Sequence, residues 1–454
     1  MRNFRKYRTA SVRAVAALLG LVLVASVTTA TATAATAAVP MAYSLSTPAG
    51  LKAPSQTSSS IILTWNNLSG ATRYRVQVST KADYSNATYY RFSENGAEIR
   101  GLPANTTHYF RVRAISESGT TNLSGYSAPV TAKTKAALAP VTKPLKVASF
   151  NIKCANCSAA GDLSWADRRG AVVANIKSTM PDVIGVQEAS QGWLAGETRD
   201  GGLAQFEDLQ ERLRASGAAY SLTNTNRNNC VKSTTPTGCV YSNQGASQGT
   251  KLYFNTATVS LISQGSLLLP KVSSTDGDRY LAWGTFIQKS TGKKFFVGDT
   301  HLDPTSGSTH HAMRIKQTQA IVSEIQKRNP ERLPVLVTGD FNSHKFTAPT
   351  NGPYDVMTGA GYVDPLGNTY AADVPSSSAT AEKTVGAFYD SYNGYSRLAK
   401  ARNKYGNGTH LDYIFTSKMR VSEWQTVAKV DSAGNFIGTI PSDHNMIQAT
   451  VQLP

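Results

Sequence analysis

A polar pair follows a short apolar run in the second half of the chain, where Val335-Leu-Val-Thr-Gly leads into Asp340-Phe-Asn342. The apolar β-formers predict a buried strand that ends near Asp340. Residues two apart in an extended chain point to the same side, so we expect Asp340 and Asn342 to face a common point while Phe341 turns into the core. A carboxylate that holds a metal or a water, beside an amide that holds a phosphate oxygen, suits phosphoryl chemistry.

Five further segments place polar side chains beside apolar strands. Each alone has an ordinary explanation, because a strand-end carboxylate is usually a cap and a strand-end histidine is usually a surface residue. Six such segments in one chain favour a single shared site. The five segments contribute Asn151, Glu188, His301, Asp412, Asp443 and His444.

These residue types predict metal-assisted hydrolysis of a phosphodiester. Mg²⁺ prefers carboxylate and amide oxygens, so we expect Asn151, Glu188 and Asp443 to bind the metal, with Mn²⁺ and Ca²⁺ as alternative ions. A bound metal neutralises the charge that grows on the phosphate and stabilises the leaving oxygen.

Proton transfer is assigned to the histidines. His444 is expected to take a proton from water, and Asp412 to fix its tautomer and raise its basicity. His301 is expected to bind the phosphate or to protonate the leaving group. Asp340 and Asn342 would orient the attacking water and the phosphate.

The order and spacing of these segments resemble the endonuclease/exonuclease/phosphatase superfamily, over about residues 145–454. That resemblance implies a four-layer α/β sandwich, with two mixed β-sheets flanked by helices. It also implies the metal-binding, positioning and acid–base roles given above. The motifs that carry it are Ser149-Phe-Asn151, Pro181-Asp-Val-Ile-Gly-Val-Gln-Glu188, Thr300-His-Leu302, Gly339-Asp-Phe-Asn342, Leu411-Asp-Tyr-Ile-Phe415 and Ser442-Asp-His444.

The elements that must position these residues alternate between strands and helices from residue 145 onward. Hydrophobic periodicity separates the two types, and this order predicts mixed sheets with helices packed outside. Helices are expected at 165–180, 203–216 and 309–328. Strands are expected at 146–152, 182–187, 251–254, 259–269, 280–288, 294–300, 335–342, 411–416 and 446–453.

Residues 42–136 form a separate all-β block. Short alternating segments separated by turn residues indicate a β-sandwich. The stretches Ile61-Ile-Leu-Thr-Trp65, 71–78 and 101–114 resemble a fibronectin type III domain, although His108 stands where that family usually has a corner tyrosine. We expect a spacer or an adhesive module that binds a surface, joined by a linker at 137–144.

Residues 1–38 have the pattern of a secretory signal peptide, with a basic start, an apolar run at 14–27 and small residues after it. The alternative is a membrane anchor, for which the run is short. We therefore expect a secreted, extracellular protein without stable membrane insertion. The four cysteines then predict two disulfides, against a four-cysteine zinc site as the rival. Four cysteines allow three pairings, of which we expect the local one, Cys154–Cys157 with Cys230–Cys239.

Charge favours a polyanionic partner. The formal net charge is +17, and 17 − 5 leaves about +12 when the basic residues of the first 38 positions are removed. The leading hypothesis is a nuclease that cuts DNA or RNA with little sequence preference. The alternatives are a sphingomyelinase-like phosphodiesterase that releases phospholipid headgroups, an inositol or sugar phosphatase, and a binding protein that has lost activity.

Overall fold

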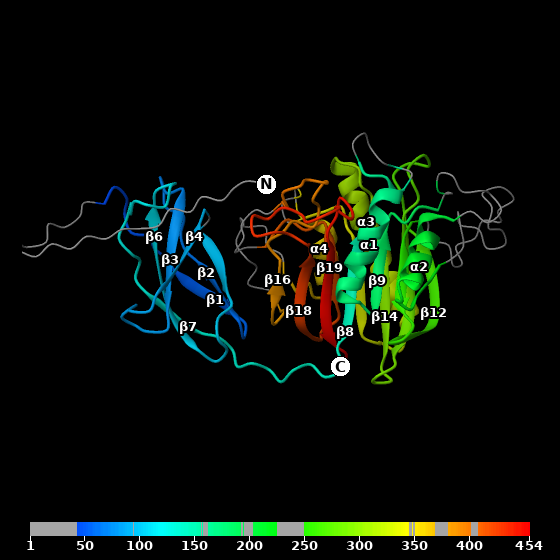
Figure 1. The fold of residues 1–454 in the computed structure, drawn as a ribbon, viewed down its shortest axis with the longest axis horizontal. Coiled ribbons are helices and arrows are strands. Elements are labelled where there is room, and N and C mark those ends of the chain that lie inside the picture. The colour runs from blue at the N-terminus through cyan, green and yellow to red at the C-terminus, as the bar shows by residue number, and fades with distance from the viewer. Residues whose placement is uncertain are drawn as a thin grey trace, which may run out of the picture. The chain divides into compact units, whose positions relative to one another are not determined.

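The computed structural model describes residues 43–454 except 94, 156, 158–161, 192–193, 195–202, 225–248, 345–346, 348–349, 368–379 and 401–406. Two sandwiches of β-strands are visible along the chain (Figure 1). The expected signal peptide and Cys230–Cys239 disulfide lie outside the described residues. None of the helices in the described ranges is long and apolar enough to cross a membrane.

The first sandwich consists of a three-stranded sheet in the order β1-β2-β5 and a four-stranded sheet in the order β4-β3-β6-β7. Its core contains Trp65, whose ring lies edge-on to those of Tyr74 and Phe92. The strands are β1 (Lys52–Gln56), β2 (Ser60–Thr64), β3 (Arg73–Ser79), β4 (Thr88–Phe92), β5 (Gly96–Arg100), β6 (Thr107–Ile115) and β7 (Val130–Lys133).

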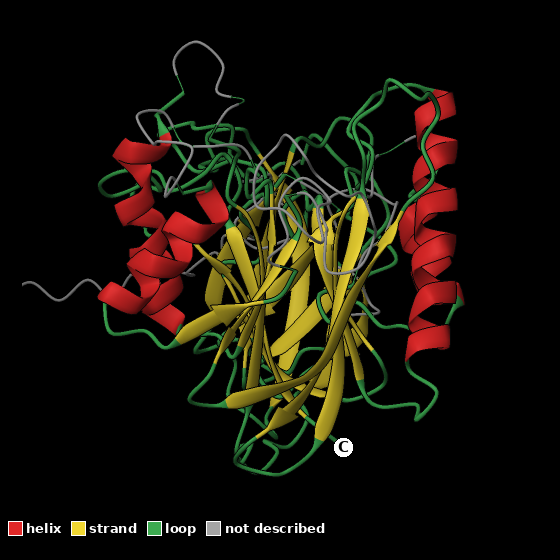
Figure 2. Cartoon of the chain, turned by 90° about the vertical axis from the view of Figure 1, so that its right-hand side faces the viewer, coloured by secondary structure: helices red, strands yellow, loops and turns green. Residues whose placement is uncertain are grey.

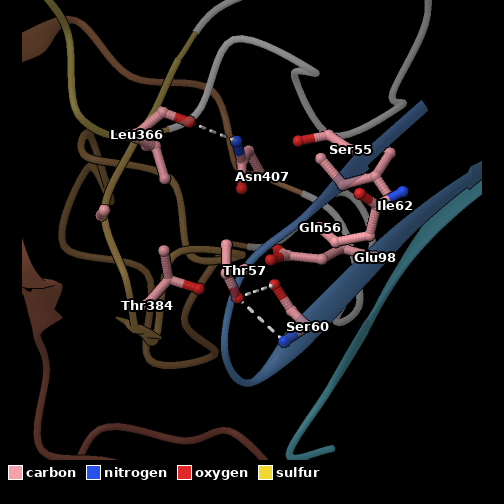
Figure 3. A pocket seen from close by; sticks show the side chains of 10 residues that line it. Ser55, Gln56, Thr57, Ser60, Ile62, Glu98, Leu366, Thr384 and Asn407 are labelled. Atoms are coloured by element: carbon pink, nitrogen blue, oxygen red, sulfur yellow. Dashed lines mark hydrogen bonds between the residues drawn. The ribbon is translucent and has the colours of Figure 1, made fainter. Parts of the chain in front are cut away.

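Two details of this sandwich are a turn closed by a short polar side chain and a buried histidine. The turn between β1 and β2 is closed by Thr57, whose Oγ1 accepts the Ser60 amide at 2.9 Å and lies 2.9 Å from Ser60 Oγ (Figure 3). His108 is buried, and burial lowers its pKa. It therefore occupies the tyrosine-corner position as a neutral, inward-facing ring.

The second sandwich contains two larger sheets. One has the order β10-β11-β9-β8-β19-β18-β16 and the other β12-β13-β14-β15-β17. The strands are β8 (Leu145–Asn151), β9 (Val183–Gln187), β10 (Tyr220–Leu222), β11 (Lys251–Asn255), β12 (Val259–Leu268), β13 (Tyr280–Gln288), β14 (Lys294–His301), β15 (Val335–Asp340), β16 (Thr384–Val385), β17 (Asp412–Thr416), β18 (Arg420–Val427) and β19 (Met446–Gln452).

Helices cover the outer faces of both sheets (Figure 2). Helices α1 (Trp165–Thr179) and α2 (Gln205–Ala215) pack on the first sheet through a cluster that includes Val172 and Leu209. Helix α3 (Ser308–Arg328) packs on the second sheet through Ile321 and Ile325, and α4 (Gly352–Gly359) packs beside it. A third apolar cluster fills the space between the sheets. The predicted four-layer α/β sandwich is therefore confirmed.

The sheets approach one another closely at Gly185 in β9. A Cβ at this position would lie 2.0 Å from Thr338 Oγ1 and 2.2 Å from Asp299 Oδ1, which belong to the opposite sheet. Asp299 is fully buried, and Thr338 and Gln187 both donate hydrogen bonds to its Oδ1. Burial raises the pKa of Asp299 well above its usual range. The contact therefore fixes the distance between the sheets.

We predict that Gly185→Ala destabilises the protein by about 1–3 kcal/mol, because a methyl group must force the two sheets apart. The matched control is Gly170→Ala on α1, where an added Cβ meets nothing within 4 Å. That change should be neutral or stabilise the helix by up to about 1 kcal/mol. Urea unfolding of both variants measures the difference, and equal midpoints for the two would contradict the close approach.

Candidate active site

Strand pairing brings the predicted residues to one end of the second sandwich. In the first sheet β8 runs parallel to β9, with Asn151 opposite Gln187 and Glu188 directly after it. In the second sheet β14 runs parallel to β15, and His301 lies opposite Asp340. The antiparallel pair β15 and β17 places Asp340 opposite Asp412. Both sheets therefore present carboxylates and an imidazole at the same end of the sandwich.

Asp340 lies at the centre of these side chains, with only 1% of its surface exposed. Asn151 Nδ2 donates to Asp340 Oδ2 at 3.1 Å across the gap between the sheets. His301 Nε2 and His444 Nε2 each lie 3.7 Å from the same oxygen. Burial and the neighbouring Asp412 raise the pKa of Asp340, while the two histidines oppose this rise. One carboxylate oxygen is thus shared by three predicted site residues.

His444 and Asp412 form the predicted dyad. His444 Nδ1 lies 2.8 Å from Asp412 Oδ2, so Nδ1 carries the proton that Asp412 accepts and Nε2 is directed to Asp340. Burial lowers the pKa of His444, but the charges of Asp412, Asp340 and Asp443 outweigh it and raise this pKa to about 10. The surrounding acids therefore favour the protonated form of His444, and a divalent cation bound beside them would lower this pKa toward neutrality.

Glu188 is held in a strained backbone conformation, with a φ of 59°. Asn151 Nδ2 donates to its Oε1 at 3.0 Å, and the Cys154 amide donates to its Oε2 at 3.0 Å. Burial opposes ionisation of this carboxyl group, but His301, Asn151 and the Cys154 amide together lower its pKa to about 2. Glu188 is therefore a carboxylate throughout the physiological pH range.

Asp443 is linked to this cluster by a residue that sequence reasoning missed. Lys153 Nζ lies 3.4 Å from Asp443 Oδ2, and its charge also acts on Glu188. Ser442 Oγ donates to the Asn151 carbonyl at 2.7 Å, which ties the segment before β19 to the end of β8. The sequence signal for this residue was a lysine two positions after Asn151. Lys153 has a positive φ of 54°, which turns the chain after β8.

His301 is neutral near pH 7. Burial and the nearby Arg279 lower its pKa to about 4, against the opposing charges of Asp340 and Glu188. This observation favours the phosphate-binding role for His301 over that of a proton donor. The side chain of Arg279 makes no hydrogen bond or ion pair among the described residues, although Asp340 and Glu188 are close enough to act on its pKa.

Asn342 departs from the expected geometry. Strand β15 ends at Asp340, and Asn342 adopts a positive φ of 45°, so the alternation of an extended chain does not reach it. Its Nδ2 donates to the Leu302 carbonyl at 3.0 Å, and its backbone amide donates to Asp340 Oδ1 at 2.9 Å. Phe341 is buried in the core as predicted. Asn342 therefore braces the loop after His301 and the Asp340 carboxylate.

The cysteine pair of the loop after β8 lies next to the site. The Cα atoms of Cys154 and Cys157 are 5.5 Å apart, a separation within the range that a disulfide requires. The bond between them stays a prediction. Because the Cys154 amide donates to Glu188, a rigid loop here would help to hold that carboxylate.

The donor set fits a hard divalent cation. Asn151, Glu188 and Asp443 offer carboxylate and amide oxygens, which are the atoms that Mg²⁺ prefers. A second group consists of Asp340, Asp412 and His444, whose ligand atoms lie within 4.8 Å of one another. In that group the buried Asp412 Oδ1 has no hydrogen-bond partner among the described residues. Acidic oxygens are therefore in excess at the site, as cation binding requires.

Two family models match the sequence of the chain. A model described as Endonuclease/Exonuclease/phosphatase family matches residues 148–444, and one described as Fibronectin type III domain matches residues 46–133. Curated protein sequences gave no significant match.

The solved structures that resemble the chain include three that each cover 68% of it. An endonuclease/exonuclease/phosphatase family protein of Bacteroides thetaiotaomicron is 19% identical, with a TM-score of 0.48 over 97% of that chain. A mannosyl-6-phosphatase of the same organism is 19% identical, with a TM-score of 0.47 over 100% of that chain. A family protein of Bacteroides vulgatus is 21% identical, with a TM-score of 0.47 over 99% of that chain.

We predict that Glu188→Gln weakens Mn²⁺ binding by at least about tenfold, because it removes the charge of a carboxylate whose pKa is lowered to about 2. Glu211→Gln, an exposed position on α2, is the matched control and should leave the affinity unchanged. Titration followed by electron paramagnetic resonance of free Mn²⁺ measures both. Equal affinities for the wild type and Glu188→Gln would remove Glu188 from the metal site.

Proposed function

Because the chain belongs to the endonuclease/exonuclease/phosphatase family, and is therefore a phosphoesterase, we propose that it is a secreted nuclease. It would hydrolyse the phosphodiester bonds of DNA or RNA with little sequence preference and with Mg²⁺ as its metal. The observation that carries the proposal is the convergence of Asn151, His301 and His444 on one buried oxygen of Asp340.

In this proposal His444 acts as the general base. Asp412 occupies Nδ1 of the imidazole, so Nε2 is the nitrogen that faces the shared Asp340 oxygen. A water held by Asp340 would lie within reach of Nε2, and the acids around His444 stabilise the imidazolium that forms when it accepts the proton. Asp412 would fix the tautomer and does not itself need to move a proton.

Asn151, Glu188 and Asp443 would hold the metal. A bound divalent cation supplies positive charge against the growing negative charge of the phosphate and stabilises the leaving oxygen. Lys153 lies beside Asp443 and would keep that carboxylate oriented in the absence of substrate.

Neutral His301 and cationic Arg279 would bind the phosphate oxygens. An imidazole that is not charged at pH 7 can donate one hydrogen bond without attracting a competing anion. The guanidinium of Arg279, with no ion-pair partner among the described residues, matches the geometry of a phosphate. Asn342 would act indirectly, by holding Leu302 and thus the position of His301.

Charge supports a nucleic acid as the substrate. The chain is strongly basic, at +17 overall and about +12 without the first 38 residues (17 − 5), which suits repeated contacts with a phosphate backbone. The sequence pattern of residues 1–38 supports export, in which case the substrate would be extracellular.

A second candidate is a phospholipid headgroup phosphodiesterase, and one observation favours it. A cavity of about 680 Å³ lies between α1 and the loop that follows β18, and its wall includes Ala171, Val427, Phe436, Ile437 and His444. Such a cavity beside the proposed base could accept an apolar part of a substrate.

The test offers three substrates to the purified full-length mature protein. Supercoiled plasmid, total RNA and sphingomyelin vesicles are each incubated with Mg²⁺ and with EDTA. We predict nicking of the plasmid or loss of the RNA with Mg²⁺ only, and no reaction for His444→Ala. Headgroup release from vesicles with intact nucleic acid would replace the proposal by the second candidate. Reaction of none of the three would contradict both.

A further inference from the structure

The outer face of the sheet β4-β3-β6-β7 in the fibronectin type III domain is strongly basic. The inward positions of these strands, such as Tyr74, Val76 and Val112, form the core of the sandwich. Alternation therefore sends the intervening residues outward. None of the four strands contains Asp or Glu. The outward cations, which we call the arginine face, are Arg73, Arg75, Arg91, Arg111, Arg113 and Lys133.

Three of these arginines lie directly opposite one another on neighbouring strands. Arg75 of β3 pairs in register with Arg91 of β4 on one side and with Arg113 of β6 on the other. Neighbouring strands are about 5 Å apart, and like charges that face each other across a pair of strands destabilise the sheet. Among the described residues, Arg73 is the one cation of the arginine face that forms an ion pair, with its Nε 2.7 Å from Glu117 Oε1. The row therefore costs stability, which a binding role would explain.

Tyrosines hold the guanidinium groups in place. Arg111 lies between two rings, 4.0 Å from the centroid of Tyr84 and 4.3 Å from that of Tyr126. Arg113 lies 4.1 Å from the Tyr126 centroid. These cation–π contacts order the charges without neutralising them. The arginine face is thus an ordered array of positive charge.

One tyrosine of this face is itself available to a ligand. Tyr89 of β4 is 57% exposed, with the Arg75 guanidinium 6.0 Å from its ring centroid. Successive bases of a single strand stack on exposed aromatic rings, while its phosphates contact cationic side chains. A membrane surface would instead require apolar side chains that enter it, and the outward positions of these strands offer no exposed aliphatic residue.

We propose that the arginine face binds single-stranded nucleic acid, with phosphates on the row of Arg91, Arg75 and Arg113 and a base stacked on Tyr89. Arginine suits this role because its planar fork can donate two hydrogen bonds to one phosphate. The inference concerns binding alone and does not depend on the proposed nuclease activity. It gives the fibronectin type III domain a nucleic-acid-binding role in place of that of a passive spacer.

The test measures binding of fluorescein-labelled oligothymidine (20 nucleotides) to the full-length mature protein by fluorescence anisotropy, in EDTA so that metal-dependent hydrolysis cannot occur. The double variant Arg91→Gln/Arg113→Gln should bind at least about tenfold more weakly. Its slope of log affinity against log salt should fall by about 1.4, because each single-strand phosphate contact contributes about 0.7.

Matched variants make the result specific to this face. Lys52→Gln/Lys327→Gln removes the same charge from exposed positions on β1 and α3 and should bind as the wild type does. Arg91→Lys/Arg113→Lys keeps the charge and should retain most of the affinity. Arg91→Gln/Arg113→Gln should unfold at or above the midpoint temperature of the wild type, because the glutamines relieve repulsion from Arg75.

Three outcomes would overturn the proposal. These are no binding of oligothymidine by the wild type, an equal loss of affinity in Lys52→Gln/Lys327→Gln, and preference for a sulfated polysaccharide over oligothymidine. The last outcome would assign the arginine face to a different polyanion. Hydrolysis with Mg²⁺ but no binding in EDTA would leave the catalytic proposal standing and remove only this one.

Discussion

The active site depends on a single buried carboxylate, Asp340, that is shared between two sheets. Its Oδ2 accepts from Asn151 of the first sheet, and two imidazoles of separate segments approach it to 3.7 Å. An acidic group that is almost completely buried is costly unless it has partners. The two sheets must therefore pack in a register that brings Asn151, His301 and His444 to Asp340. The close approach at Gly185 allows that register.

Electrostatics divide the remaining groups into distinct roles. Burial lowers the pKa of both histidines, but their net pKa values differ because their charged neighbours differ. His301 adjoins Arg279 and has its pKa lowered to about 4, whereas His444 adjoins three acids and has its pKa raised to about 10. Two chemically identical side chains that contact one oxygen are thereby separated into a neutral hydrogen-bonding group and a strongly basic group.

Much of this arrangement could be predicted from the sequence, because polar residues at strand ends are visible as interruptions of apolar runs. Asn151, Glu188, His301 and Asp340 were found in this way, and the dyad of His444 and Asp412 followed from their chemistry. Asn342 was placed incorrectly because a strand end cannot be located to one residue from propensity, and its φ of 45° cancels the alternation. Lys153 was missed as a site residue because its role depends on how the loop after β8 places its side chain beside Asp443. The registers of Arg75, Arg91 and Arg113 required the sheet itself.

The most direct measurement of the central claim is the rate at which Asp340→Asn hydrolyses bis(p-nitrophenyl) phosphate with Mg²⁺. The substitution keeps the size of the side chain and an oxygen that can accept the Asn342 amide. The account predicts a fall in kcat of at least about 100-fold, with a thermal midpoint close to that of the wild type. A kcat within about twofold of the wild type in a folded variant would contradict it, because the site would then operate without its shared carboxylate.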